Sequence, residues 1–197
     1  MTRLVVLASG SGSNLQAILD ACADGRLPAQ VAAVVSNRPG SGALQRAADA
    51  GVPYVQVAPH AGEPRPDYDA RLADIVSGFD PDWVVLAGWM RILSMSFLGW
   101  FPGMVVNLHP ALPGELPGVD SIARAWLEAQ HGHRDHTGVM VHLVPDEGVD
   151  VGPVLATATV PIQPTDTLES LTDRVHGVEH RLLVETLATL CTTGANA

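Results

Sequence analysis

The sequence predicts an α/β protein built on a parallel sheet, and three observations carry that prediction. Short apolar runs rich in branched side chains alternate with stretches in which apolar residues recur at helical spacing. Most of these runs end at Gly, Ser or Asn, and they are too short for buried helices. In a chain of 197 residues, this alternation is typical of strand-helix-strand units that form a parallel sheet covered by helices.

The first half alternates strand and helix from its first residues. The expected strands span residues 3–8, 31–35, 52–57 and 83–87. The expected helices, identified by apolar residues three or four apart, span 15–22, 43–50 and 67–77. Ser and Asn side chains just before the first helix are candidate N-caps. Proline, glycine and histidine over residues 58–66, between the strand at 52–57 and the helix at 67–77, mark a loop.

The second half opens with an apolar strand at 103–108. A loop over 110–118 follows, whose prolines and glycines make it irregular but stiff, and we interpret it as an active-site loop. The elements expected after it are a helix at 122–130, strands at 139–144 and 153–161, and a long helix at 167–190.

Composition excludes two classes of protein. Hydrophobic residues make up 47% of the chain and charged residues 16%, so enough apolar surface is available to offset the entropy of ordering, and disorder is excluded. The 21 acidic residues outnumber 11 basic ones, all of them arginine, and the net charge of -10 repels nucleic-acid phosphates. We therefore expect a compact protein that binds no nucleic acid.

The cysteines and histidines indicate neither a disulfide scaffold nor a metal site. Cys22 and Cys191 stand far apart in the sequence and form no C-x-x-C pair. His131, His133 and His136 lack the shared face and the acidic or cysteine partner of a zinc site, so we interpret them as part of a polar loop. The first apolar run is too short for a signal peptide or a membrane span, which leads us to expect a cytoplasmic protein without a membrane partner.

A glycine- and serine-rich loop joins the first strand to the first helix. Residues 9–14 read Ser-Gly-Ser-Gly-Ser-Asn, and the free backbone N–H groups at a helix start favour an anion such as phosphate. The loop matches neither a P-loop nor a full G-x-G-x-x-G fingerprint. Spacing alone leaves two interpretations equally open, a phosphate site or a tight turn with a serine cap.

Polar side chains follow the strand at 103–108, at the carboxyl end where ligands collect in open α/β sheets. Asn107 and His109 flank Leu108 and should point to the same side of the strand. An amide and an imidazole aimed at one atom suit a developing oxyanion, and histidine moves protons near neutral pH. A hydrogen-bonded surface histidine is the other interpretation.

An acidic loop could supply a partner carboxylate. Residues 146–153 carry Asp146, Glu147 and Asp150 in a glycine-bearing turn between two expected strands. The functional interpretation is that Asp150 orients an imidazole and carries a proton, and the alternative is a solvated surface turn.

Five strings occur in an order and spacing that resemble one known family. They read Val-Leu-Ala-Ser-Gly-Ser-Gly-Ser-Asn-Leu-Gln-Ala-Ile (6–18), Val-Val-Ser-Asn-Arg (34–38), Leu-Ala-Gly-Trp-Met-Arg-Ile-Leu (86–93), Asn-Leu-His-Pro-Ala-Leu (107–112) and Asp-Glu-Gly-Val-Asp-Val-Gly-Pro-Val (146–154). The chain thereby resembles, over nearly its whole length, the glycinamide ribonucleotide formyltransferases, folate-dependent enzymes of purine biosynthesis.

The resemblance implies a Rossmann-like formyltransferase fold, with a mostly parallel twisted sheet flanked by helices and an antiparallel C-terminal portion. It implies a single domain over 1–197, divided into a phosphate-binding mononucleotide half (1–100) and a catalytic and folate-loop half (101–197). The implied substrates are glycinamide ribonucleotide and 10-formyltetrahydrofolate, with no metal required. We expect a monomer or a homodimer.

The resemblance also implies roles for individual residues. The residues implied on the side of the ribonucleotide are Gly12, Ser13, Asn14 and Glu179. The residues implied on the folate side are Arg65, Met90, Arg91, Ile92, Leu93 and Asn107.

Asn107, His109 and Asp150 correspond to the catalytic trio of the family. The resemblance implies that the acceptor amine attacks the formyl carbon directly, so that neither an enzyme nucleophile nor a metal takes part. Asn107 and protonated His109 would stabilise the oxyanion, while Asp150 would support the imidazolium and help relay the amine's proton to the leaving nitrogen.

Two segments depart from the family pattern. The loop over 111–120 lacks the aromatic residue and the later histidine that relatives usually carry. The loop after His142 is one residue longer, with Pro145 as the apparent insertion, so Asp150 is assigned from the Val-Asp-x-Gly-Pro match and Asp146 is the second candidate.

Two alternatives to this function stay open. One is the same chemistry on another amine, such as an amino-sugar nucleotide or methionyl-tRNA, although the length and the net charge of -10 predict no additional basic domain for tRNA. The other is a non-catalytic nucleotide-binding module, which would need the phosphate loop but not the catalytic trio.

Overall fold

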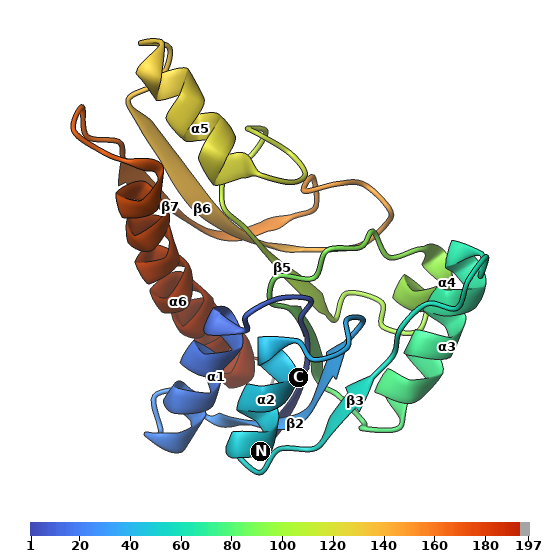
Figure 1. The fold of residues 1–197 in the computed structure, drawn as a ribbon. Coiled ribbons are helices and arrows are strands. Elements are labelled where there is room, and N and C mark those ends of the chain that lie inside the picture. Colours follow the sequence, from blue (N-terminus) through green and yellow to red (C-terminus); the bar gives the residue numbers. More distant parts are fainter. Residues whose placement is uncertain (194–197) are drawn as a thin grey trace.

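The computed structural model describes residues 1–193, which form seven strands and six helices (Figure 1). The strands are β1 (Thr2–Leu7), β2 (Ala29–Ser36), β3 (Tyr54–Gln56), β4 (Trp83–Leu86), β5 (Val105–His109), β6 (His136–Leu143) and β7 (Val154–Pro161). The helices are α1 (Ser13–Ala23), α2 (Gly42–Asp49), α3 (Arg65–Ser77), α4 (Met95–Leu98), α5 (Ser121–Gln130) and α6 (Leu168–Thr193). The last four residues of the expected 1–197 domain lie outside this description.

The strands make one sheet in the order β3-β2-β1-β4-β5-β6-β7. The pairs from β3 to β5 are parallel, whereas β6 pairs antiparallel with β5 and β7 pairs antiparallel with β6. The expected fold class, mostly parallel with an antiparallel C-terminal portion, is therefore confirmed. The order reverses between β1 and β4, so the carboxyl ends of these two strands face a crevice in which open α/β sheets bind ligands.

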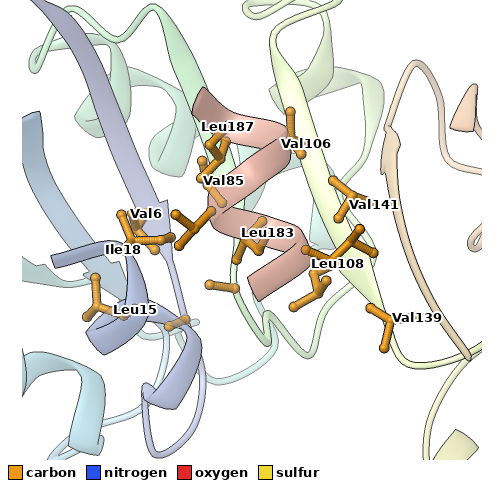
Figure 2. Packing of buried hydrophobic residues seen from close by; sticks show 14 of the residues in the cluster. Val6, Leu15, Ile18, Val85, Val106, Leu108, Val139, Val141, Leu183 and Leu187 are labelled. Atoms are coloured by element: carbon orange, nitrogen blue, oxygen red, sulfur yellow. The ribbon is translucent and has the colours of Figure 1, made fainter. Parts of the chain in front are cut away.

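Helices cover both faces of the sheet. Helices α1, α5 and α6 lie on one face, and α3 and α4 lie on the other (Figure 1). The branched side chains of β1, β4, β5 and β6 pack against Leu15 and Ile18 of α1 and against Leu183 and Leu187 of α6 (Figure 2). Because the central strands are buried on both faces, they read as continuous apolar runs in the sequence.

The structure corrects three local expectations. The expected third strand at 52–57 shortens to β3, because the N–H of Val52 bonds to the carbonyl of Ala47 and closes the turn after α2. Helix α4 was not expected, since four residues are too few to show a helical period. The N-cap of α1 is Gly12 rather than a Ser or Asn, and no side chain caps this helix.

None of the helices within residues 1–193 combines the length and the hydropathy that crossing a bilayer requires.

Candidate active site

A cavity of about 540 Å³ opens at the carboxyl ends of β4 and β5. Its walls come from the segment after β4, the end of β5, the acidic loop between β6 and β7, and both ends of the loop that joins β5 to α5, called here the 110–120 loop. Asn107, His109 and Asp150 all line it, as do Asp146 and His142. Asn107 and Asp150, 43 positions apart in sequence, thus face one space because β5 lies beside β6 in the sheet and the loop that follows β6 returns to this edge.

The candidate trio is in direct contact. The Nδ2 of Asn107 donates to Oδ1 of Asp150 at 3.2 Å, and Nδ1 of His109 lies 3.3 Å from Oδ2 of Asp150. The side chains of His109 and Asp150 are largely buried, that of Asn107 is half-buried, and Asp150 adopts a left-handed φ of 55°. Because non-glycine residues rarely adopt that conformation, directing this carboxylate into the cavity costs conformational free energy at Asp150. Asp146, the second candidate, instead accepts a hydrogen bond from the N–H of Gly148 in its own turn.

His142 is a member of the cluster that the sequence reasoning missed. It lies on β6 opposite Asn107 in the antiparallel register, and the two side chains meet with 3.1 Å between Nδ2 of Asn107 and Nε2 of His142. Since Nδ1 of His142 donates to the carbonyl of Leu143 at 2.9 Å, Nε2 accepts from the amide. The sequence does show a histidine within an otherwise apolar strand. The strand register that places it opposite Asn107, however, depends on the tertiary structure.

The backbone of the 110–120 loop supplies two further partners. The carbonyl of Leu116 lies 3.1 Å from Nε2 of His109 and also accepts from the hydroxyl of Ser121 at 2.9 Å. The N–H of Gly118 donates to Oδ2 of Asp150 at 2.9 Å. The loop therefore touches both partners of the imidazole-carboxylate pair, although it lacks the aromatic residue and histidine of the family pattern.

Burial and contacts set the protonation of this pair. Burial lowers the pKa of His109 below 6.5, and the Asp150 carboxylate and the Leu116 carbonyl oppose that effect. Burial acts in the other direction on Asp150, yet the Gly118 N–H and the charge of His109 help to hold its pKa below 3.8. At neutral pH the cluster therefore presents a carboxylate beside an imidazole that readily loses its proton.

The glycine- and serine-rich loop places α1 with its N-terminus free. Gly12 has a φ of 75°, and a Cβ there would lie 2.7 Å from the Cα of Ala43, so only glycine lets the loop pass α2 this closely. Without a side-chain cap, the first-turn N–H groups around Ser13 and Asn14 are available to an anion. These residues do not line the 540 Å³ cavity.

Glu179 meets this helix start from α6. Its Oε2 accepts a hydrogen bond of 3.4 Å from Nδ2 of Asn14, while Oδ1 of Asn14 is buried without a partner. Burial raises the pKa of Glu179 to about 7, and the contact with Asn14 only partly opposes that effect. A buried carboxyl next to an unpartnered amide oxygen leaves polar groups ready for a ligand bearing hydroxyl or amine groups.

The segment after β4 joins the two regions. The hydroxyl of Ser9 accepts from the N–H of Met90 at 2.9 Å, and the N–H of Ser9 donates to the carbonyl of Gly88 at 3.0 Å. Met90, Arg91, Ile92 and Leu93 all line the cavity, and the guanidinium of Arg91 lies 4.7 Å from the centroid of the Tyr68 ring. The helix start at α1 and the cavity are thereby held at adjoining positions.

Arg65 lies outside the cavity lining. It begins α3 and forms an ion pair with Glu147 of the acidic loop, whose other oxygen accepts from the N–H of Met95 at 3.2 Å. Both side chains of the pair are about 40% exposed, so the arginine can exchange this carboxylate for another.

Within residues 1–193, no group of three or more His, Cys, Asp or Glu side chains comes together as a metal site would require. The histidines at 131 and 133 follow α5, and His136 begins β6, where it contacts Asp135.

The chain is similar to known proteins over nearly its whole length. A family model described as "Formyl transferase" matches residues 2–187. The phosphoribosylglycinamide formyltransferase of Schizosaccharomyces pombe is 43% identical over 201 residues, covering 96% of this chain and 97% of that protein. The protein of the same name from Mycobacterium tuberculosis is 44% identical over 194 residues, covering 98% and 86%. The crystal structure of glycinamide ribonucleotide transformylase 1 from Geobacillus kaustophilus superposes with a TM-score of 0.89 at 42% identity, covering 96% of this chain and 98% of that one.

Proposed function

The chain belongs to the formyl transferase family, and we propose that it transfers the formyl group of 10-formyltetrahydrofolate to the amine of glycinamide ribonucleotide. Formyl transfer to this ribonucleotide in purine biosynthesis is the activity of its relatives, which it matches along its length. We infer the folate donor and the roles of the individual residues from the cavity and the side chains that line it. The contact of Asn107, His109 and Asp150 at the wall of one cavity carries the proposal.

The ribonucleotide would bind at the start of α1. Its phosphate would accept hydrogen bonds from the free N–H groups around Gly12, Ser13 and Asn14, and the helix dipole favours its charge. Glu179 and the unpartnered Oδ1 of Asn14 would face the ribose and the amine. In this division, the half at 1–100 provides the phosphate site and the half at 101–197 provides the catalytic groups.

The donor would enter the cavity of about 540 Å³, a volume in the usual range for a small-molecule site. The buried side chains of Trp89 and Leu93 and the backbone of 90–93 would hold a flat, partly polar ring, and Asn107 would reach its reactive end. Arg65 would pair with a carboxylate of the donor at the rim in place of Glu147. When bound, the donor supplies the formyl carbon and a leaving nitrogen.

The residues then act on charge and protons. Attack by the amine places negative charge on the formyl oxygen, and Asn107 would donate one N–H to it in exchange for its contact with Asp150. His109, protonated in this step, would supply the second donor, and the carboxylate of Asp150 would stabilise the imidazolium. The bond between the formyl carbon and the donor nitrogen then breaks, and Asp150 would help to pass the amine's proton to that leaving nitrogen, so no covalent enzyme intermediate is needed.

Purified protein with 10-formyltetrahydrofolate and glycinamide ribonucleotide tests the proposal by the absorbance of the folate product. We expect turnover, and we expect His109→Ala to lower it about a hundred- to a thousandfold while circular dichroism shows an unchanged fold. Turnover with another amine, such as an amino-sugar nucleotide, and not with glycinamide ribonucleotide would mean that this other amine is the acceptor. Binding of both ligands without turnover would favour a nucleotide-binding module instead.

A further inference from the structure

Arg134 lies outside the candidate site and is the centre of an ion-pair network that reaches the 110–120 loop. Its Nη1 donates to Oε2 of Glu115 at 2.5 Å, and its Nε donates to Oε2 of Glu128 at 2.7 Å. Nη1 also donates to the carbonyl of His136 at 3.3 Å. The guanidinium therefore ties together the end of α5, the start of β6 and the loop, and its side chain is only 15% exposed.

Glu115, which forms the ion pair with Arg134, is next in sequence to Leu116, which contacts His109. Glu115 precedes Leu116, whose carbonyl lies 3.1 Å from Nε2 of His109, and two residues later the N–H of Gly118 bonds to Asp150. Leu116 has a left-handed φ of 44°, a conformation that a non-glycine residue keeps only where its surroundings impose it. Its side chain is buried, and Ser121 bonds to the same carbonyl.

We propose that the ion pair of Arg134 with Glu115 is a positioning device for the catalytic cluster. The ion pair fixes the position of the loop, so that the Leu116 carbonyl remains in contact with Nε2 of His109 and the Gly118 N–H remains hydrogen-bonded to Asp150. Among the described residues, the other charged side chains that contact the loop near Leu116 are Asp150, a member of the cluster, which accepts from the N–H of Gly118, and Arg124, which donates to the carbonyl of Pro117 at an exposed position. Arg134 and Glu115 touch no reacting atom, and the inference rests on the proposed roles of His109 and Asp150.

Loosening the loop should bring the pKa values of His109 and Asp150 closer together. The Leu116 carbonyl favours protonated His109, so its loss lowers the pKa of His109 further. The Gly118 N–H favours ionised Asp150, so its loss raises the pKa of Asp150. The charged and titratable groups that face this pair are each other and His142, and none of them changes in the test.

The test compares Glu115→Gln with Glu128→Gln. Both substitutions remove one carboxylate from the same guanidinium, and both glutamates are partly exposed, but only Glu115 is on the loop. We expect Glu115→Gln to lower kcat about five- to tenfold with the KM for glycinamide ribonucleotide within twofold, and to narrow the pH profile of kcat from both sides. Glu128→Gln should leave kcat and the profile unchanged, and Glu115→Asp, which keeps the charge, should recover part of the loss.

A second measurement does not depend on the substrate. Titration of the His109 ring by NMR in the free protein should give a lower pKa in Glu115→Gln than in the wild type and in Glu128→Gln. Equal effects of the two glutamine variants on kcat, on the pH profile and on the melting temperature would mean that Arg134 only stabilises the fold, and the positioning role would be wrong. If the wild type forms no product from the two proposed substrates, the proposed function fails, whereas the NMR comparison still decides the role of the ion pair.

Discussion

Asn107 on β5 and His142 on β6 face each other across an antiparallel strand pair, with 3.1 Å between Nδ2 of Asn107 and Nε2 of His142. The same Nδ2 of Asn107 donates its other N–H to Asp150. By accepting the first N–H, His142 keeps the NH₂ group of the amide, and not its oxygen, directed at the carboxylate. The orientation of the proposed oxyanion donor is therefore set by a residue from a different strand.

Replacing His142 should weaken catalysis through Asn107. In His142→Phe the amide of Asn107 loses the acceptor Nε2 and is held by Asp150 alone, so we expect kcat to fall about tenfold, less than the loss from removing an oxyanion donor itself. Steady-state kinetics measure this effect. His142→Gln, which can offer an amide oxygen to the same N–H, should retain more activity than His142→Phe; the opposite order would contradict the positioning of Asn107 by this contact.

The buried carboxyl of Glu179 should make stability depend on pH. Because its pKa rises from 4.5 to about 7 on folding, the folded chain binds more protons than the unfolded chain between these values. This contribution to stability is therefore full below about pH 4.5 and is lost as pH rises through about 7, amounting to roughly 3 kcal/mol. Glu179→Gln should unfold in urea at a higher midpoint than the wild type at pH 8, with a smaller advantage at pH 5. The exposed Glu185 on the same helix provides the control, and an equal response of Glu185→Gln would contradict the assignment.

Arg65 should control the affinity for the donor. If its guanidinium pairs with a carboxylate of 10-formyltetrahydrofolate, Arg65→Ala should raise the KM for the donor about tenfold, which corresponds to about 1.4 kcal/mol, and leave the KM for the ribonucleotide unchanged. Glu147→Gln should have the opposite sign and lower the KM for the donor about twofold, because the competing carboxylate is removed from an exposed pair. Arg26→Ala, an exposed arginine paired with Asp24 on another face, should change neither constant. An unchanged KM for the donor in Arg65→Ala would remove Arg65 from the donor site.

The close passage of Gly12 past α2 should make this position intolerant of a side chain. Gly12→Ala adds a Cβ at 2.7 Å from the Cα of Ala43 and demands a left-handed backbone, which costs roughly 1–2 kcal/mol by itself. We expect the KM for glycinamide ribonucleotide to rise at least tenfold, because the loop must shift away from its place at the start of α1. Gly10→Ala is the matched control, since a Cβ there meets no atom within 4 Å. Similar kinetics for the two variants would argue against a phosphate site in this loop.

Local pattern was enough to predict most of the fold. The buried parallel strands appear in the sequence as branched apolar runs because both faces of each strand are covered, and the helices appear through their spacing because one face of each is apolar. The places where the pattern failed are short. Helix α4 has too few residues for a period, and β3 is limited by the turn that ends α2.

The sequence by itself determined which chemical groups the chain carries and the strand ends on which they lie. Asn107 and His109 share one side of β5 because side chains alternate along a strand, and that follows from their spacing alone. Tertiary structure decided which groups meet. Asp150 rather than Asp146 reaches His109 because a left-handed residue turns the longer loop inward, and His142 joins the cluster through a strand register. Distances between residues far apart in the chain depend on how the sheet and loops pack, and no local pattern encodes them.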